Sequence, residues 1–325
     1  MYRTLWAVAR RLGLAAGLVL AVLAVNFTLI HAAPGDPAMV IAGEMGGSDE
    51  AAMAEIRKAY GLDRPLPAQF VTYLSRSLHG DLGRSYLLNR PVLELILDRI
   101  GPTILLVFTA LLAAITIGTL LGVLASRKPD SIFSGVVTVT SLVGYAMPVF
   151  WTAILLVILF GKVWPVLPIA GMRDVRLYGG LWVRTLDVLH HLVLPAATLA
   201  IVYVAQYSRL ARTSMLEVLG SDYIRTARAK GLGEGPVVFK HALRNALMPI
   251  VTIAGLQFGH LISGALLVET VFSWPGMGTL ALESILGRDY PVLLGILTFS
   301  AILVIVANLL TDLSYRWLDP RLRGR

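Results

Sequence analysis

Six stretches of this chain contain no Asp, Glu, Lys or Arg, and they constrain its fold more than any other feature. They cover residues 12–30, 103–125, 132–161, 192–208, 246–268 and 291–311, which together make up 133 of the 325 residues. A helix needs about 20 apolar residues to cross a hydrocarbon core of about 30 Å. Because backbone amides in lipid must be satisfied within the segment, these long runs predict six membrane-spanning helices rather than a barrel.

The composition agrees with a membrane protein whose charges are confined to its loops. Hydrophobic residues make up 56% of the chain and charged residues only 15%, against about 25% in soluble proteins. The net charge of +8 would fit a nucleic-acid-binding protein, but the basic residues stand as short flanks of apolar runs. Since the chain contains no cysteine, disulfides and thiolate metal sites are excluded.

The basic residues also predict how the chain is oriented. Six spans place both termini on one side, where the loops contain 16 Lys and Arg, against five in the shorter loops opposite. The positive-inside rule then puts both termini in the cytoplasm. The alternative, that the first span is a cleaved signal peptide, is disfavoured because its apolar run is too long and no A-x-A site follows. The expected parts are a cytoplasmic N-terminus with the first span (1–30), an extracytoplasmic loop (31–102), a five-helix core (103–314) with a cytoplasmic loop at 213–246, and a cytoplasmic tail (315–325).

Two loops contain residues that typically start or end a helix, and these predict short helices. In the loop 31–102, one helix is expected between Ser48 and Gly61 and a second between Pro67 and Gly80. A third should follow Pro91 and lie at the membrane interface before the second span, because its apolar residues share one face.

In the loop 213–246, Ser221 and Asp222 supply N-cap chemistry for a helix over Tyr223–Lys230, which Gly231 ends. Pro236 can begin a second helix, Val237–Leu247. The pattern predicts a compact module of helix, glycine turn and helix. The alternative is a merely basic loop that faces lipid headgroups.

Polar residues within the spans are candidates for a solute pathway. Gln257, His260 and Ser263 recur on one face of the fifth span, and Asn308 lies in the sixth. In a transporter such a strip would face the conduit, whereas in a structural bundle it would supply hydrogen bonds between helices. Glu269 ends the fifth span and could line the mouth of a pathway or pair with a basic residue.

Glycine, proline and tryptophan add expectations about packing. The spacing of Gly255 and Gly259 allows close helix approach, although the signal is weak. Pro148 and Pro195 lie inside the third and fourth spans and should kink them. The Trp-Pro-Gly sequence that starts at Trp274 would make a turn with its indole in the aromatic belt at the membrane interface.

Common catalytic motifs are absent from the sequence. There is no G-x-x-x-x-G-K-[ST], no H-E-x-x-H and no Gly-x-Ser-x-Gly. An intramembrane protease that uses Ser263 and His260 is disfavoured because Ser263 stands in Leu-Ile-Ser-Gly. The sequence therefore predicts no catalytic residue and no metal site, and nucleotide is not expected to be hydrolysed by this chain in the P-loop manner.

Several motifs in order resemble one family of transport proteins. Residues 222–232 (Asp-Tyr-Ile-Arg-Thr-Ala-Arg-Ala-Lys-Gly-Leu) and 241–249 (His-Ala-Leu-Arg-Asn-Ala-Leu-Met-Pro) resemble the coupling loop of ABC-importer permeases, especially the dipeptide, oligopeptide and nickel group. That loop is named for Glu-Ala-Ala, three residues, then Gly. In this chain the matching residues before Gly231 are Arg-Thr-Ala. They depart from the general consensus but are similar to the form found in the peptide group. Further agreement lies in residues 34–37 (Pro-Gly-Asp-Pro), 80–85 (Gly-Asp-Leu-Gly-Arg-Ser), 268–278, 288–291 (Arg-Asp-Tyr-Pro) and 318–321 (Leu-Asp-Pro-Arg).

The resemblance implies an all-α membrane protein of the type I ABC importer permease fold, with six transmembrane helices, in the bacterial inner membrane. It implies a second homologous permease subunit, an extracytoplasmic solute-binding protein and two ATPase subunits, which hold ATP and Mg while this chain binds no cofactor. The residues expected to couple to the ATPase are Asp222, Tyr223, Arg225, Thr226, Ala227, Arg228, Lys230 and Gly231. The lower-ranked pathway candidates are Gln257, His260, Ser263, Glu269 and Asn308. A passive channel or scaffold is the alternative function, and the sequence does not name the solute.

Overall fold

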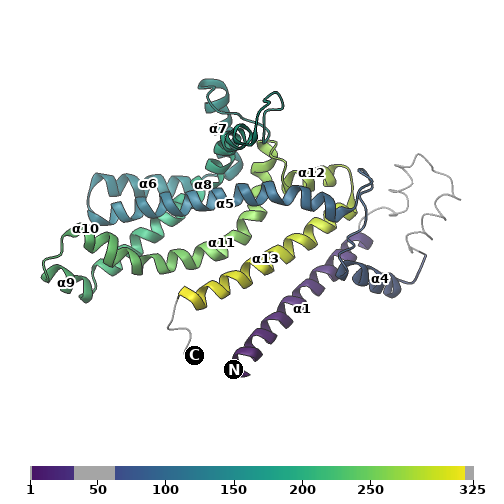
Figure 1. Ribbon diagram of the computed structural model, residues 1–325, viewed down its shortest axis with the longest axis horizontal. Coiled ribbons are helices and arrows are strands. Elements are labelled where there is room, and N and C mark those ends of the chain that lie inside the picture. Colours follow the sequence, from purple (N-terminus) through teal and green to yellow (C-terminus); the bar gives the residue numbers. More distant parts are fainter. Residues whose placement is uncertain (1, 33–62, 319–325) are drawn as a thin grey trace. The chain divides into compact units, whose positions relative to one another are not determined.

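The computed structural model describes residues 2–32 and 63–318, and these are folded almost entirely into helices (Figure 1). Within these ranges no strand occurs, and the only bridge between extended residues joins Arg84 to Pro91. The all-α prediction is confirmed. Contacts divide the chain into two units, Met1–Gly101 with Leu280–Val306, and Pro102–Thr279 with Ala307–Arg325.

The six uncharged stretches lie in helices, apart from a break at Met147 and Pro148 in the third. Among the described residues, four helices are long and apolar enough to cross a membrane, and a bent pair of helices would make a fifth span. The described part of α1 adds a shorter apolar segment, Gly13–Leu29. The four long segments are Val92–Arg127, Leu181–Leu219, Glu234–Gly255 and Tyr290–Leu309.

The third predicted span is broken rather than kinked. Helix α6 (Ile132–Ala146) is followed by α7 (Val149–Ile158) and the π-helical η1 (Leu159–Val163), and the two parts meet at 105°. Met147 and Pro148 both have extended backbone, with ψ of 130° and 134°. A residue before proline avoids helical angles, and proline has no N–H to continue the ladder, so the helix stops and restarts.

The first unit contains α1 (Tyr2–Ala32), α4 (Leu66–Leu78), the start of α5 (Val92–Arg127) and most of α13 (Tyr290–Leu318). Asn26 of α1 is buried, and its amide donates to Thr298 Oγ1 at 2.9 Å and to the Leu294 carbonyl at 3.3 Å. Phe27 stacks edge-on against Phe70 of α4, with ring centroids 5.2 Å apart. These contacts place α1 between α4 and α13.

The expectations for the loop 31–102 are met in part. The helix predicted between Ser48 and Gly61 lies outside the described residues. The second is present as α4, which begins after Pro65. The third helix begins directly after Pro91 as predicted, but it is not separate from the second span, because α5 runs from Val92 without a break through Pro102. Its first turns are held by burial, since Val92 and Ile96 are fully buried and a Cβ on Gly295 of α13 would collide with Val92.

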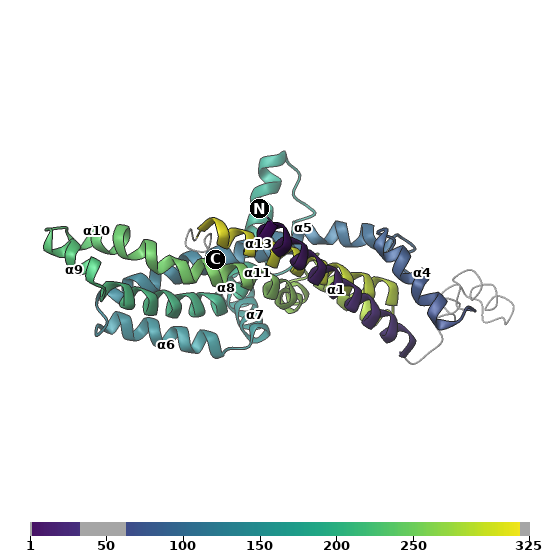
Figure 2. The same cartoon turned by 90° about the horizontal axis from the view of Figure 1, so that it is seen from below.

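The second unit is a helical bundle around α8 (Leu181–Leu219), which packs against α6, α7 and α11 (Leu243–Val271). In Figures 1 and 2 the bundle is elongated, with α9 (Asp222–Ala229) and α10 (Glu234–Pro236) at one end. Helices α5 and α8 touch through their backbones at Gly118 and Gly122. A Cβ on Gly118 would lie 2.7 Å from that of Tyr207, and one on Gly122 would collide with the Ser208 carbonyl. The small-residue spacing that the structure uses at this crossing is therefore Gly118–Gly122.

Candidate functional site

The motif-bearing residues 222–232 fold into α9 (Asp222–Ala229) and the turn that ends it. The prediction that Gly231 ends this helix is confirmed, because Gly231 has φ +80° and two backbone hydrogen bonds close the helix at this point. The Gly231 N–H donates to the Arg228 carbonyl at 2.9 Å, and the Leu232 N–H donates to the Ala227 carbonyl at 3.4 Å. This pair of bonds is the Schellman motif, which satisfies carbonyls at the end of a helix.

The N-terminus of α9 differs from the expectation. Ser221 occupies the N-cap position with extended backbone, but its side chain makes no capping hydrogen bond. Its hydroxyl instead donates to the Val218 carbonyl of α8 at 2.5 Å. Ser221 therefore links α9 to the end of α8, and it does not cap α9 in the usual way.

One face of α9 is anchored in the chain's own core. Ile224 and Ala227 belong to a buried cluster with residues of α5, α8 and the start of the fifth span. The other members of the cluster are Val123, Met215, Val237, Val238, Ala242 and Ala246. The small side chain of Ala227 thus permits close packing within this protein, and it does not lie on the exposed face of the helix.

The opposite face of α9 is polar, basic and open. Tyr223, Thr226 and Lys230 are exposed, as are Asp222 and Arg225. The ion pair of Asp222 and Arg225 spans 3.5 Å, but both side chains are at least 74% exposed. Exposed pairs of this kind contribute little stability, so both side chains are available to another molecule.

Two polar contacts tie α9 to the helix that follows. Arg228 donates to both carboxylate oxygens of Glu234 across the glycine turn, at 2.7 and 3.2 Å, and these hydrogen bonds raise the pKa of Arg228. The Asn245 amide donates to the Tyr223 hydroxyl at 2.7 Å. Neither Glu234 nor Asn245 was expected to take part from the sequence, although Asn245 stands within the second motif of the coupling loop.

The second helix of the module is continuous with the fifth span. Helix α10 (Glu234–Pro236), the π-helical η2 (Val237–Ala242) and α11 follow one another without a loop. The predicted helix over 237–247 is therefore the beginning of a long helical rod. Through Tyr223 and Asn245, α9 is bonded directly to that rod.

The structure describes the side chains of some of the pathway candidates. Gln257 is half-buried on α11, and its amide donates to Gln206 Oε1 of α8 at 3.2 Å. Asn308 of α13 is exposed. His260 and Ser263 lie on α11, but their side chains are outside the described part of the structure. The described contacts therefore place one candidate, Gln257, in a bond between helices.

Glu269 is fully buried and organises the turn after α11. The Thr103 hydroxyl donates to its Oε1 at 2.6 Å, and the Gly278 N–H donates to its Oε2 at 2.6 Å. The Met277 N–H in turn donates to Thr103 Oγ1 at 2.8 Å. The carboxylate thus accepts from the first turn of α12 (Met277–Leu286), and a Cβ on Gly276 would collide with it.

The prediction that the Trp274 indole lies in the aromatic belt at the membrane interface is wrong. Its side chain is fully buried, and Nε1–H donates to the Pro102 carbonyl at 2.9 Å. A buried indole needs such an acceptor, and the interior of the second unit supplies it. The Trp-Pro-Gly sequence therefore makes its turn inside the protein.

The first unit contains a second buried carboxylate, Asp289, at the start of α13. It accepts from the Ser85 hydroxyl at 2.5 Å and from the N–H groups of Tyr86 and Leu87 at 3.2 and 3.3 Å. The Leu88 N–H donates to Ser85 Oγ at 2.9 Å. The motif residues around positions 80–85 and 288–291, which lie far apart in the sequence, therefore meet at this carboxylate.

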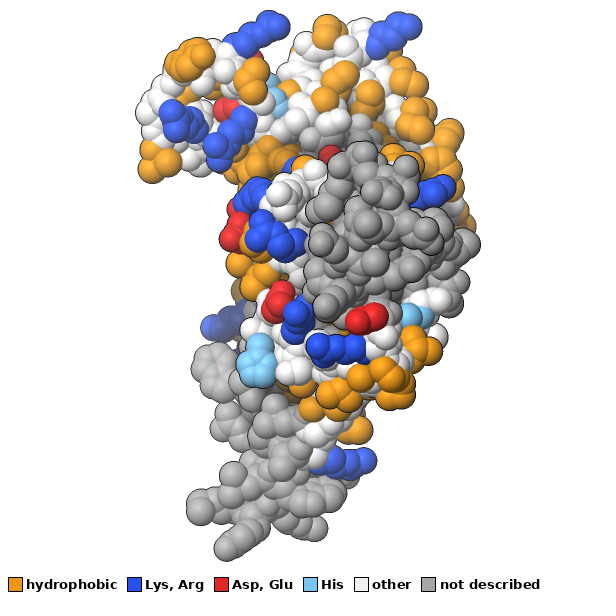
Figure 3. Space-filling model, turned by 90° about the vertical axis from the view of Figure 1, so that its right-hand side faces the viewer, with side chains coloured by type: hydrophobic (Ala, Val, Ile, Leu, Met, Phe, Trp, Pro, Cys, Tyr) orange, Lys and Arg blue, Asp and Glu red, His pale blue; other side chains and the backbone are white. Residues whose placement is uncertain are grey.

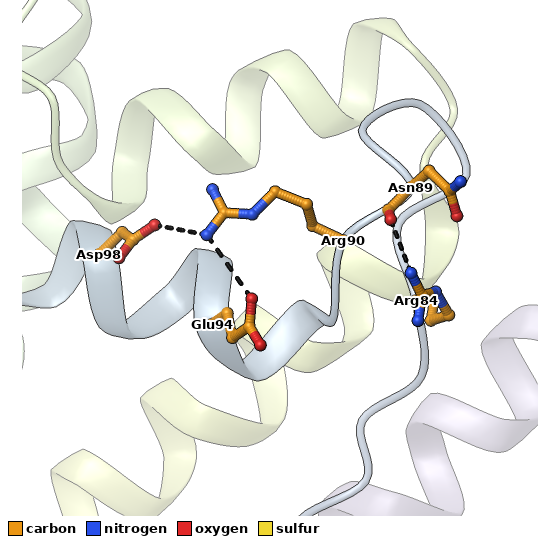
Figure 4. Close-up of polar contacts among 5 residues, drawn as sticks. All are labelled: Arg84, Asn89, Arg90, Glu94 and Asp98. Atoms are coloured by element: carbon orange, nitrogen blue, oxygen red, sulfur yellow. Dashed lines mark hydrogen bonds and ion pairs between the residues drawn. The ribbon is translucent and has the colours of Figure 1, made fainter.

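The loop at residues 84–90, which is hydrogen-bonded to Asp289, turns tightly and has charged side chains at its surface. Arg84 donates to the Asn89 carbonyl at 2.8 Å, and Asn89 has φ +48° (Figure 4). Arg90 lies between two acids of α5, 3.0 Å from Asp98 Oδ2 and 3.6 Å from Glu94 Oε2 (Figure 4). All three side chains are about half exposed, so the group shapes the loop surface more than it stabilises the fold.

The comparison with known proteins decides the family. Residues 114–324 match the family described as binding-protein-dependent transport system inner membrane component, and residues 1–107 match the N-terminal region of such membrane components. The chain belongs to this family. The permease is 40% identical to the dipeptide transport system permease protein DppB of Escherichia coli (strain K12), over 97% of this chain and 98% of the relative. It is 41% identical to the di/tripeptide transport system permease protein DppB of Pseudomonas aeruginosa (strain UCBPP-PA14), with the same coverage.

Solved structures support the fold. The permease resembles a chain of the MetNI methionine ABC transporter in inward-facing conformations, with a TM-score of 0.55, 19% identity, and coverage of 69% of this chain and 96% of that one. A chain of an amino acid ABC transporter gives a TM-score of 0.51, 15% identity, and coverage of 69% and 94%. The sequence-based interpretation as an ABC-importer permease, a multi-pass protein of the inner membrane, is confirmed.

Proposed function

We propose that this permease carries di- or oligopeptides, or a similar small solute, across the inner membrane as one half of the translocation path of an ATP-driven importer. The relatives named for dipeptide and di/tripeptide transport, at about 40% identity over nearly the whole chain, support the peptide substrate. The observation that carries the coupling role is α9, whose buried face is fixed to three helices while its other face is polar and open.

The complete importer would contain a second homologous permease, two ATPase subunits and a solute-binding protein. ATP and Mg would be held by the ATPase subunits, and this chain would bind no cofactor and catalyse no reaction. The distribution of Lys and Arg supports cytoplasmic termini, an extracytoplasmic loop over 31–102 and a cytoplasmic loop over 213–246. That orientation puts α9 on the side where ATP is available.

In this mechanism the exposed face of α9 meets an ATPase subunit, and nucleotide-driven movement of that subunit displaces the helix. Asp222, Tyr223, Arg225, Thr226 and Lys230 would make the contact. Arg228, Ala227 and Gly231 would act from behind it, through the Glu234 pair, the buried cluster and the Schellman turn. Because α9 is bonded to α11 and packs on α5 and α8, its displacement would reach the spans.

The solute would pass along helices of the second unit and their counterparts in the second permease. Gln257, His260, Ser263 and Asn308 remain our candidates for contact with it. Glu269 was proposed with them, but its burial and its hydrogen bonds support a structural role in holding α12. A passive channel would need neither the open face of α9 nor its tie to α11.

The test is the number of solute molecules imported per ATP hydrolysed by the complex in proteoliposomes. Tyr223→Phe keeps the ring but removes the hydroxyl that accepts from Asn245, and one hydrogen bond of about 1 kcal/mol corresponds to a factor of about five. We expect import per ATP to fall by up to this factor while the complex still assembles. Tyr178→Phe, a change far from α9 in the sequence, is the matched control and should leave the ratio unchanged.

Three outcomes would reject the proposal. If the purified permease binds no ATPase subunit, or moves solute without ATP, the passive channel is correct. If the chain has a proteolytic activity that Ser263→Ala abolishes, the protease alternative is correct. If the Ser263→Ala variant still imports solute, the protease alternative is excluded.

A further inference from the structure

A projecting segment of the second unit, residues 173–186, is called the arm here. The loop before it is fixed to the bundle, because the Gly171 N–H donates to the Phe272 carbonyl at 2.8 Å. Beyond that point the chain turns at Asp174 and enters the first turns of α8, which extend away from the rest of the bundle (Figures 1 and 2). Nothing in the transport mechanism above uses this segment.

The arm exposes large apolar side chains to an unusual degree. Val175, Tyr178, Leu181 and Trp182 are between 74% and 90% exposed. A cluster of large apolar side chains at the surface marks a site that another apolar phase covers. Two of the four are the aromatic residues that concentrate where the membrane meets water.

The arm contains three arginines and one acid, Asp174, so its net charge is +2. Asp174 and the neighbouring Asp187 are held by contacts within the chain. Asp187 Oδ2 accepts from the Asp174 N–H at 2.9 Å, and its Oδ1 lies 3.1 Å from His191 Nδ1. Asp174 Oδ1 accepts from the Arg176 N–H at 2.9 Å.

The three arginines, Arg173, Arg176 and Arg184, are exposed, and within the described residues their side chains form no ion pair or hydrogen bond. In Figure 3 the top of the molecule, where Figure 1 places the arm, shows basic side chains among hydrophobic ones and few acidic ones. The open charges of the arm therefore favour an anionic partner.

An apolar stripe connects the arm to the membrane-spanning part of α8. Trp182, Leu186, Leu189 and Val193 are all exposed, and their spacing of four, three and four residues places them on one helix face. The opposite face carries His191, which is buried with its partner Asp187. The stripe runs into the uncharged stretch 192–208, so it continues the surface that lipid tails cover.

We propose that the arm lies on the membrane surface and binds anionic phospholipid headgroups. Tyr178 and Trp182 would lie among the headgroups, and Arg173, Arg176 and Arg184 would bind their phosphates. A bilayer with anionic lipid supplies in one place the apolar phase that the stripe needs and the negative charge that the arginines need. A protein partner would have to supply both along a surface that is continuous with lipid.

The proposal also fixes how the start of α8 must be inclined. Twenty residues counted back from Ser208 reach Leu189 and fill a hydrocarbon core of about 30 Å. An upright helix would carry Trp182 about 10 Å further, beyond a headgroup layer of roughly 5–8 Å. The segment before Pro195 must therefore tilt toward the membrane plane. Pro195 cannot donate to the His191 carbonyl, and this missing bond makes tilting easier there.

The lack of cysteine permits a direct test of where the arm lies. A fluorophore on Tyr178→Cys is compared with one on Thr226→Cys of α9, in nanodiscs that contain phosphatidylglycerol, for the permease alone and for the complex with its co-purified partners. We expect brominated phospholipid to quench the label at 178 at least threefold more than the label at 226 in both samples. If iodide in water quenches it instead, or if assembly shields it from both quenchers, the arm faces water or protein and the proposal is wrong.

The role of the arginines has its own readout. Phosphatidylglycerol retained by the purified permease is counted by native mass spectrometry for the triple variant Arg173→Ala, Arg176→Ala, Arg184→Ala and for the exposed control Arg76→Ala. A several-fold loss in the triple variant alone is expected, and equal retention in both would overturn the headgroup assignment. Neither measurement depends on ATP or on the solute, so both remain valid if the peptide-import proposal fails.

Discussion

Replacing Gly231 by alanine should loosen the end of α9 without disturbing any neighbour. A Cβ built on Gly231 meets no atom within 4 Å, so the substitution introduces no clash. Its only cost comes from the backbone, because φ is +80° and an L-residue in the left-handed region is disfavoured by roughly 1–2 kcal/mol. Such a cost corresponds to a factor of about 5 to 30 in the equilibrium for opening the turn.

Gly233 offers a matched control two residues away. It has φ −64° and ψ 155°, which any residue adopts, and the nearest atom to a Cβ there is Pro236 Cδ at 4.0 Å. Gly233→Ala should therefore change little. Gly231→Asn should fall between the two, because asparagine tolerates the left-handed region better than alanine does.

The assay is hydrogen–deuterium exchange of the peptide that covers residues 222–232 in the assembled complex. The amides of Lys230, Gly231 and Leu232 close the end of the helix and report its opening directly. Exchange in Gly231→Ala should rise by the factor worked out above, and import per ATP should fall with it. Equal exchange in Gly231→Ala and Gly233→Ala would refute the argument, because it would mean that the left-handed turn does not hold α9 in place.

Three further variants test the buried contacts through the midpoint of thermal unfolding in detergent. Gly122→Ala forces α5 and α8 apart at a backbone contact and should cost about 1–3 kcal/mol, whereas Gly135→Ala, where a Cβ meets nothing within 4 Å, should cost much less. Glu269→Ala leaves buried donors of the α12 turn without their acceptor and should cost about 1–3 kcal/mol, while the exposed Glu283→Ala should be nearly neutral. Ser85→Ala removes one donor to a buried carboxylate and should lower the midpoint; an unchanged midpoint would show that the loop it holds does not stabilise the fold.

Features that depend on neighbouring residues were predicted well from the sequence. Uncharged stretches of the right length predicted where the spanning helices lie, because the cost of charge in lipid acts on each segment separately. The end of α9 followed from Gly231, since a Schellman turn involves only six consecutive residues.

Features that depend on distant residues were not predicted. Pro91 and the apolar face that follows it suggested a short helix before the second span, but burial of Val92 and Ile96 against α13 keeps α5 continuous. The acceptor of the Trp274 indole, the Pro102 carbonyl, lies 172 positions away in the chain, so no local pattern indicated that this side chain is buried.

Other structural features had a pattern in the sequence, but the prediction used that pattern only in part. Gly118 and Gly122 have the same spacing as Gly255 and Gly259 but were not singled out from the sequence, and two helices touch at them. Pro148 was expected to bend its helix. The observed bend of 105° includes two extended residues, and the packing of α7 on α8 and α11 contributes to it as well as the missing N–H of Pro148. Asn245 could have been found only by knowing that Tyr223 lies beside it.

The π-helical turn at Val237–Ala242 should let the helical rod that runs from α10 into α11 tolerate the loss of one residue. A π turn holds one more residue than the α-helical turn it replaces, because each N–H bonds five positions back instead of four. Deleting one residue here would let the turn relax into α-helix, with α9 and the fifth span keeping their registers on either side. A one-residue deletion that would rotate every later side chain by about 100° elsewhere in a helix can be absorbed in this turn.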